Sequence, residues 1–195
     1  NLKQMKLFSK SYVNNLLNFK NNHNYVMVSF HPETIGNKSK KIFKNLLTSL
    51  GSLKKINIIF TKANADPESQ LINLMIDEFV RKNNINSRSF ISMGKKLYFS
   101  TMKYSLMLIG NSSSGIIEAP SLNLPTINIG TRQKGRVRPE SVIDSKDDVK
   151  SISKTINVVL DNRRKNMYKN VNNPYYKNQT IRKSINVLFK NLEKI

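Results

Sequence analysis

Residues 106–120 read LMLIGNSSSGIIEAP, and this segment indicates the fold class. It opens with an uninterrupted apolar run at residues 106–109, continues through a glycine-bounded turn of small polar residues, and ends in a short helical pattern. A strand without polar alternation is typical of a parallel sheet whose two faces are both covered by helices. The segment therefore predicts a buried parallel strand that leads directly into a helix.

Similar pairs of strand and helix lie on both sides of this segment. Apolar strand patterns occur at 25–30, 55–61, 87–91 and 126–129, and helical patterns occur at 1–20, 39–50, 67–83, 95–103, 115–121, 145–162 and 180–195. The helix at 67–83 is predicted to bury a face made of Leu71, Leu74, Met75, Phe79 and Val80. This alternation predicts an α/β fold, a Rossmann-like doubly wound parallel sheet. Ligands of such sheets bind beyond the carboxyl ends of the strands, so a site is expected in the loops that follow them.

Length and composition limit the classes of protein. A chain of 195 residues has the length of one domain, or of one half of a two-domain enzyme. Cysteine is absent and the histidines are His23 and His31, which excludes disulfides, thiolate chemistry and metal sites built from several His or Cys ligands. We expect no metal and no cofactor. No apolar run approaches the roughly 20 residues that cross a bilayer, and no signal peptide is recognisable, so a cytoplasmic protein without a membrane partner is expected.

The charge raises the question of a nucleic-acid partner. Lys and Arg number 33 against 12 Asp and Glu, which gives a net charge of +21. Most of these cations are Lys, whereas Arg is the residue that phosphate forks favour. No zinc-finger spacing, RNP-type aromatic segment or basic heptad array accompanies them. A solvated, Lys-rich surface is the favoured interpretation, and no nucleic-acid partner is expected.

Residues 110–115 (GNSSSG), here called the serine loop, are the most distinctive of the loops after strands. A turn of this kind between strand and helix exposes backbone N–H groups and hydroxyl donors, which suits a phosphate or diphosphate. The alternative is that Ser114 only caps the following helix. Glu118 lies about one turn further on and can accept hydrogen bonds from two vicinal sugar hydroxyls, or it can act as a capping glutamate.

Three further loops carry polar residues at strand ends. His31 follows the strand at 25–30 and can donate to a phosphate oxygen or serve as a structural partner. Asn64 and Asp66 follow the strand at 55–61, and Asp66 is interpreted as a cap of the next helix. Arg132 follows the strand at 126–129 and can clamp an anion in bidentate fashion or remain a surface charge.

The segments FHPET (30–34), ANAD (63–66), IGNSSSGIIEAP (109–120) and INIGTRQKGRVRPESVI (127–143) resemble the carboxyl-terminal half of the hydrolysing UDP-N-acetylglucosamine 2-epimerases. This family includes enzymes of sialic acid biosynthesis type and relatives that act on GDP- or UDP-linked bacillosamine derivatives. The resemblance covers residues 25–143. It implies one half of a GT-B type enzyme, with two Rossmann-like domains and the nucleotide held mainly by the carboxyl-terminal domain.

The resemblance also implies a set of residues that bind the nucleotide sugar, UDP-N-acetylglucosamine or a similar molecule. Ser112 and Ser113 would hold the diphosphate, Glu118 the ribose hydroxyls, and the backbone near Met93 the base. His31 and Arg132 would contact the phosphate or sugar region, and Asn64 would lie by the sugar. The implied residues are His31, Asn64, Met93, Ser112, Ser113, Ser114, Gly115, Glu118 and Arg132.

The implied reaction eliminates the nucleoside diphosphate to leave a glycal and then adds water, which gives the 2-epimeric free sugar. Its acid and base come from the amino-terminal domain, so we expect a piece of a longer enzyme that binds nucleotide without turnover. The expected division is a helical lead-in at 1–24, a nucleotide-binding domain at 25–162 and a basic helical segment at 163–195, with any homo-oligomer formed through the full-length protein. The alternatives are a diacetylbacillosamine 2-epimerase, a GT-B glycosyltransferase half, and a noncatalytic binding module.

Overall fold

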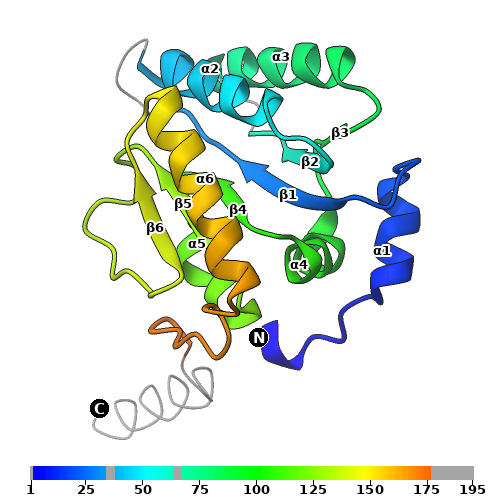
Figure 1. Ribbon diagram of the computed structural model, residues 1–195, viewed down its shortest axis with the longest axis vertical. Coiled ribbons are helices and arrows are strands. Elements are labelled where there is room, and N and C mark those ends of the chain that lie inside the picture. Colours follow the sequence, from blue (N-terminus) through cyan, green and yellow to red (C-terminus); the bar gives the residue numbers. More distant parts are fainter. Residues whose placement is uncertain (1, 34–37, 64–66, 177–195) are drawn as a thin grey trace, which may run out of the picture.

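A six-stranded sheet in the order β3-β2-β1-β4-β5-β6 forms the centre of the protein (Figure 1). The computed structural model describes residues 2–33, 38–63 and 67–176. Every neighbouring pair of strands is parallel. The strands are β1 (Asn24–Ser29), β2 (Ile56–Thr61), β3 (Ser87–Phe90), β4 (Leu108–Gly110), β5 (Thr126–Ile129) and β6 (Val142–Ser145). The predicted α/β, Rossmann-like doubly wound sheet is therefore confirmed.

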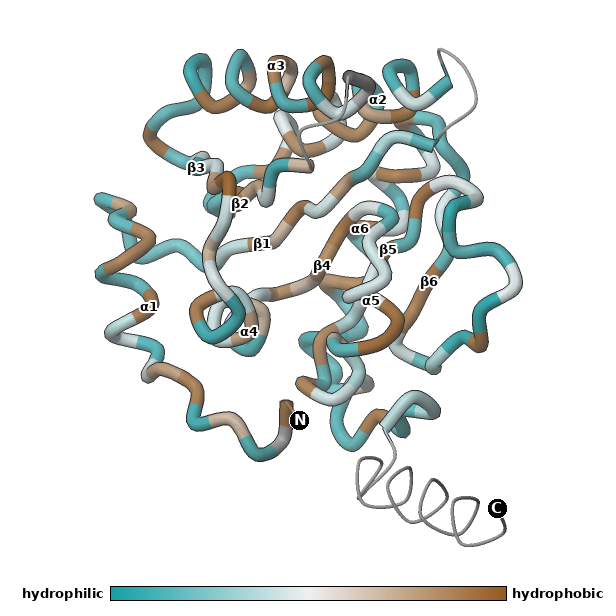
Figure 2. The backbone as a smooth tube through the Cα atoms, turned by 180° about the vertical axis from the view of Figure 1, so that it is seen from behind, coloured by the Kyte–Doolittle hydropathy of each residue, from teal (hydrophilic) through white to brown (hydrophobic). Residues whose placement is uncertain are grey.

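Helices cover both faces of the sheet (Figures 1 and 2). The first face carries α2 (Lys38–Gly51), α3 (Pro67–Lys82) and α6 (Val149–Arg164). The second face carries α1 (Lys10–Leu17), α4 (Gly94–Tyr104) and the short pieces α5 (Ser114–Ile117) and η2 (Ala119–Leu122), while η1 (Leu2–Gln4) lies near the start of the chain. Residues of β1 alternate between the two cores, because Val26 and Val28 pack on the first face and Tyr25 and Met27 on the second.

The arrangement of β1 and β4 locates the crevice where ligands of such sheets bind. These two strands are neighbours, paired from Met27↔Leu108 to Ser29↔Gly110. The chain leaves β1 toward α2 on the first face and leaves β4 toward α5 on the second face. The loops after β1 and β4 therefore diverge and flank the topological switch point of the sheet.

Two expectations about secondary structure were wrong. The helix predicted at 145–162 begins only at Val149, where Asp148 caps it, and residues 142–145 form the edge strand β6, which was not predicted. The continuous helix predicted at 1–20 is limited to α1, which begins after the N-cap Ser9 and ends at Asn18 in the left-handed conformation.

The predicted inner face of α3 was correct in part. Met75, Phe79 and Val80 pack against the core beside the buried Ile72 and Ile76. Leu71 and Leu74 do not belong to this face, because they are 40% and 66% exposed. The helix predicted at 180–195 lies outside the described residues, and the division at 24 and 162 stays a prediction.

Candidate functional site

Asn111 connects the loop after β1 to the loop after β4. Its side-chain Oδ1 accepts from the backbone N–H of His31 at 2.8 Å, and its Nδ2 donates to the backbone carbonyl of His31 at 2.8 Å. The backbone N–H of Asn111 donates to the carbonyl of Ser29 at 3.2 Å. The two loops at the switch point are thus held in one fixed arrangement.

The loop after β5 is attached to the same residue. The buried Gln133 side chain donates to the carbonyl oxygen of Asn111 at 2.7 Å, and the Arg132 guanidinium donates to that oxygen at 3.3 Å. Asn111 is therefore the common contact of the loops that carry His31, the serine loop and Arg132.

Glu33 links the first loop to the loop after β5 independently. Its carboxylate accepts from the backbone N–H of Thr131 at 2.8 Å, from the Thr131 hydroxyl at 2.8 Å and from the backbone N–H of Arg132 at 3.0 Å. Partial burial raises the pKa of the Glu33 carboxyl. The hydrogen bonds and the nearby charge of Lys38 together lower this pKa by more, so the net shift is downward. Glu33 is thus an ionised structural clamp.

Glycine is required where this clamp is made. Gly130 has φ +86°, and a Cβ at that position would lie 2.5 Å from Oε1 of Glu33. A second requirement arises at Gly110, where φ is +138° and a Cβ would overlap the backbone carbonyl of Ser29. The close approach of the loops therefore depends on both glycines.

The helix after the serine loop is shorter than expected. α5 contains four residues, Ser114–Ile117, so the helix dipole contributes little. The N-cap position is held by Ser113, whose side chain makes no capping hydrogen bond, and the Ser112 hydroxyl accepts only a long 3.4 Å bond from the N–H of Ser114. Capping therefore does not explain the run of serines.

A cavity of about 380 Å³ opens beside the serine loop at the carboxyl ends of the strands. Four of the residues predicted to bind substrate line it: His31, Met93, Ser112 and Ser114. They come from the loops after β1, β3 and β4, so the fold brings together positions up to 83 residues apart, from 31 to 114. Polar groups from separate loops converging on one cavity are typical of a ligand site.

Tyr98 on α4 lines the same cavity and was not predicted. Burial raises the pKa of its hydroxyl, and the nearby Glu118 carboxylate raises it as well, whereas side-chain hydrogen bonds with Ser114, Ser29 and Ser112 lower it in part. The hydroxyl of Tyr98 therefore connects Ser112 and Ser114 of the serine loop with Ser29 at the end of β1.

Glu118 sits between α5 and η2, and its carboxylate caps neither piece. Its Oε2 atom is buried and finds no hydrogen-bond partner in the part of the chain that the structure describes. A buried carboxylate oxygen without a donor is costly. The capping interpretation of Glu118 is therefore wrong.

The other predicted positions lie as follows. Ser113 and Gly115 belong to the serine loop, and Gly115 packs tightly on Thr126 of β5, whose hydroxyl donates to its carbonyl at 2.9 Å. Arg132 is exposed on the loop after β5. Asn64 and Asp66 lie outside the described residues. Sequence reasoning missed Tyr98, Asn111 and Gln133. The adjacency of Asn111 to the serines was the available signal.

The described residues show neither a cluster of metal ligands nor a helix that could span a membrane. Within residues 2–33, 38–63 and 67–176, no three His, Asp or Glu side chains gather as metal ligands. No helix in those ranges is long and apolar enough to cross a membrane.

The sheet order and the similar solved structures define a Rossmann-like domain of the kind that forms one half of a GT-B type protein. Comparison with known sequences is more specific. The chain belongs to the UDP-N-acetylglucosamine 2-epimerase family, which matches residues 2–189.

Similar proteins support this assignment. The chain is 41% identical over 145 residues to GDP/UDP-N,N'-diacetylbacillosamine 2-epimerase (hydrolyzing) of Campylobacter jejuni, a match that covers 74% of this chain and 38% of the relative. It is 38% identical over 166 residues to polysialic acid biosynthesis protein P7 of Escherichia coli, covering 84% of this chain and 42% of the relative. The chain thus spans about two fifths of the length of these curated relatives.

A solved structure shows the same fold. The crystal structure of Methanocaldococcus jannaschii UDP-GlcNAc 2-epimerase in complex with UDP-GlcNAc and UDP matches with a TM-score of 0.68 at 17% identity. The match covers 97% of this chain and 50% of that chain.

Proposed function

We propose that this chain is the carboxyl-terminal, nucleotide-sugar-binding half of a hydrolysing UDP-N-acetylglucosamine 2-epimerase. The observation that carries the proposal is the buried, unpartnered Oε2 of Glu118. Glu118 follows directly after the serine loop, whose residues Ser112 and Ser114 line the cavity at the switch point. The ribose of a nucleotide offers two vicinal hydroxyl donors to such a carboxylate. Family membership supports the proposal.

The proposed ligand arrangement uses the three loops together. Ser112, Ser113, Ser114 and Gly115 of the serine loop bind the diphosphate. Glu118 binds the ribose, and the backbone near Met93 contacts the base. His31 and Arg132 approach the phosphate or sugar from the neighbouring loops, with Asn64 beside the sugar. The guanidinium adds a positive charge at the place where the leaving diphosphate accumulates negative charge.

The reaction of the whole enzyme is an elimination followed by a hydration. A base removes the proton at C2 while an acid assists departure of the nucleoside diphosphate, and water then adds to the glycal to give the 2-epimeric free sugar. Of the acidic residues near the described loops, Glu33 is engaged by Thr131 and Arg132, and Glu118 is assigned to ribose. We therefore assign the acid and base to the amino-terminal domain of the family.

Nucleotide binding by this chain tests the assignment first. We expect UDP to raise its melting temperature, because ligand bound to the folded state stabilises by about 2.7 kcal/mol at a hundredfold excess over Kd. Glu118→Gln and Ser113→Ala are expected to weaken binding by roughly 1.5 to 3 kcal/mol each without unfolding the chain. Glu78→Gln on α3, on the first face, is the matched charge control. Unchanged affinity in Glu118→Gln would remove the ribose assignment.

Turnover assays test whether catalysis requires the amino-terminal domain. The chain alone is expected to release no nucleotide from a nucleotide sugar, whereas a protein that also contains the amino-terminal domain releases UDP together with a 2-epimerised free sugar. Release by the chain alone would contradict the proposal, and a product with unchanged C2 configuration would contradict the epimerase assignment. Transfer of the sugar to an acceptor would favour a glycosyltransferase.

One comparison supports an alternative substrate, a diacetylbacillosamine nucleotide sugar. The relative that is 41% identical is a GDP/UDP-N,N'-diacetylbacillosamine 2-epimerase (hydrolyzing). Parallel assays with UDP-N-acetylglucosamine and with GDP- and UDP-linked diacetylbacillosamine identify the substrate by the larger kcat/KM.

A further inference from the structure

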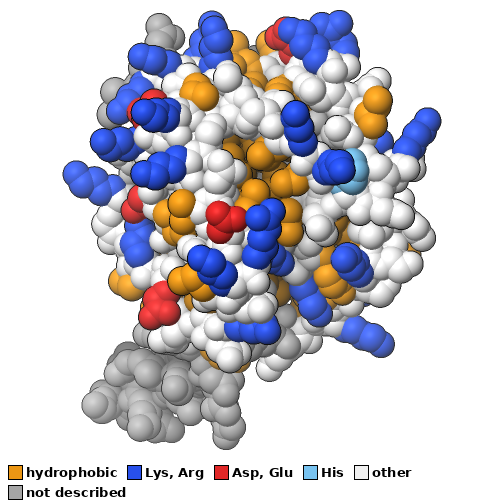
Figure 3. All heavy atoms as spheres, viewed as in Figure 1, with side chains coloured by type: hydrophobic (Ala, Val, Ile, Leu, Met, Phe, Trp, Pro, Cys, Tyr) orange, Lys and Arg blue, Asp and Glu red, His pale blue; other side chains and the backbone are white. Residues whose placement is uncertain are grey.

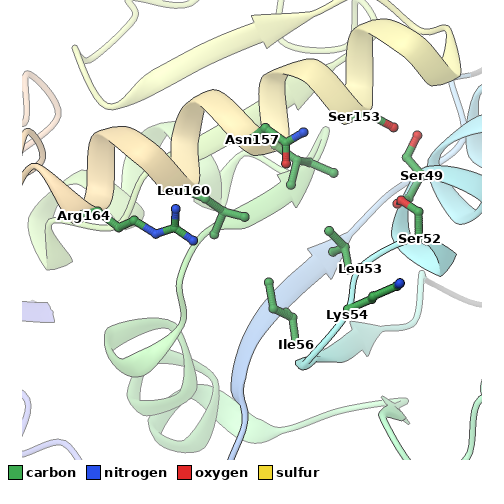
Figure 4. Close-up of a pocket in the computed structure, with 10 residues that line it drawn as sticks. Ser49, Ser52, Leu53, Lys54, Ile56, Ser153, Asn157, Leu160 and Arg164 are labelled. Carbon is green, nitrogen blue, oxygen red and sulfur yellow. The ribbon is translucent and has the colours of Figure 1, made fainter.

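A hollow lies at the amino-terminal ends of the central strands, at the opposite end of the sheet from the serine loop, between α2, α6 and the segment that enters β2 (Figures 3 and 4). It consists of two adjoining cavities of about 320 Å³ and 470 Å³, which share Lys54, Ile56, Leu160 and Arg164. Neither cavity shares a lining residue with the cavity beside the serine loop. It is therefore a separate place for a ligand.

The charged side chains that line this hollow are all cationic. They are Lys54, Lys55, Arg163 and Arg164, and no described Asp or Glu lines either cavity. We call this region the cationic hollow. Its floor is apolar, formed by Leu53, Ile56, Leu106, Ile156 and Leu160, and Figure 3 shows hydrophobic side chains at the bottom of a hollow ringed by Lys and Arg side chains.

Arg163 is partly buried, whereas Lys54, Lys55 and Arg164 are exposed. Burial lowers the pKa of its guanidinium, and no ion pair or hydrogen bond joins that guanidinium to another described residue. By contrast, Arg164 is exposed and pairs with Asp161 at 3.1 Å, and Arg88 donates to the carbonyls of Asn18 and Ser87. Removing a charge from water without a partner is costly, and a bound anion would offset this cost.

The hydroxyl groups in the hollow are mostly occupied. Ser49 donates to the carbonyl of Asn45 at 3.1 Å, and Ser52 donates to the carbonyl of Ser49 at 2.7 Å. Figure 4 shows Ser153 and Asn157 on α6 facing these serines across the hollow. The strongest donors available to a ligand are therefore the ammonium and guanidinium groups, which suit a phosphate.

We propose that the cationic hollow is a second ligand site, which binds a small phosphorylated molecule with an apolar body. Its phosphate pairs with Arg163, Lys54 and Lys55, and its apolar part covers Ile56 and Leu160. The site shares no lining residue with the cavity beside the serine loop, so a nucleotide bound there does not block it.

The test uses phenyl phosphate and inorganic phosphate as probes on the 15N-labelled chain saturated with UDP. We expect phenyl phosphate to shift the amide signals around Lys54 and the end of α6, with saturation, and to bind at least tenfold more tightly than inorganic phosphate because of the apolar floor. Signals of the serine loop should not move. The same titration without UDP separates this result from the nucleotide proposal.

Substitutions decide whether the hollow or the basic surface in general binds the probe. Arg163→Gln and, independently, the exposed Lys54→Gln are expected to weaken phenyl phosphate at least fivefold. Lys154→Gln, on α6 but outside the lining residues, is the control and should bind as the parent does. Shifts that spread over the Lys-rich surface without saturation, equal affinities for the two probes, or equal effects of Lys154→Gln and Lys54→Gln would overturn the proposal.

Discussion

Replacing Gly130 by Ala tests whether Glu33 clamps the loop after β5. The new Cβ would lie 2.5 Å from Oε1 of Glu33, and φ at Gly130 is +86°. Gly135, in the same loop, has φ +85° but nothing within 4 Å of an added Cβ. The two positions therefore impose the same backbone strain, and only Gly130 adds a collision with the carboxylate.

The magnitudes follow from these geometries. The left-handed conformation costs a non-glycine residue about 1 to 2 kcal/mol, which is the full effect expected for Gly135→Ala. Gly130→Ala adds the displacement of a carboxylate that accepts three hydrogen bonds from Thr131 and Arg132. Hydrogen bonds to a charged group contribute about 1.5 to 3 kcal/mol. Because Glu33 is partly exposed, we expect Gly130→Ala to cost about 1.5 kcal/mol more than Gly135→Ala.

Urea denaturation followed by circular dichroism measures both variants, and a third background isolates the clamp. In Glu33→Ala the collision partner is absent, so Gly130→Ala should cost no more than Gly135→Ala. Equal costs for the two glycine variants in the parent chain, or an undiminished cost of Gly130→Ala in Glu33→Ala, would refute the reasoning.

Two other results are expected. Tyr98→Phe keeps the buried ring but removes the hydroxyl near Ser112 and Ser114, so UDP affinity measured by calorimetry should fall by about 1 kcal/mol while the melting temperature changes little; a large loss of stability at unchanged affinity would mean a purely structural role. The folded-state pKa of Glu33 is lowered, so its contribution is complete above the unfolded value of about 4.3 and is lost as pH falls through the folded value. The difference in stability between the parent and Glu33→Gln should therefore shrink between pH 7 and 3, and a pH-independent difference would contradict this.

The central strands were predictable because burial on both faces leaves an apolar run in the sequence. The edge strand β6 has no such signal, since its residues Val142–Ser145 include an exposed Asp and none is fully buried. For α3 the sequence correctly predicts Met75, Phe79 and Val80 on the packed face. Packing against the sheet buries Ile72 and Ile76 rather than Leu71 and Leu74, which local periodicity cannot decide.

The candidate site was predictable to the extent that its residues follow strands. The fold places His31, Met93, Ser112 and Ser114 around one cavity, while their binding roles remain proposals. Asn111 was missed because its contacts reach 80 residues back along the chain to His31. Tyr98 was missed because an aromatic residue within a helical pattern is the ordinary sign of core packing.

The side chain of Asn111 has the same donor and acceptor as a peptide group, so its two bonds to the main chain of His31 add one more rung to the sheet after β1 and β4 have ended. The rim of the crevice is consequently rigid before any ligand arrives, and binding loses little entropy in ordering it. Main-chain contacts therefore set the shape of the rim, whereas the side chain of His31 takes no part in the two bonds to Asn111. Asn111 holds position 31 through its main chain, so an exchange of the imidazole leaves in place the two hydrogen bonds that position the loop.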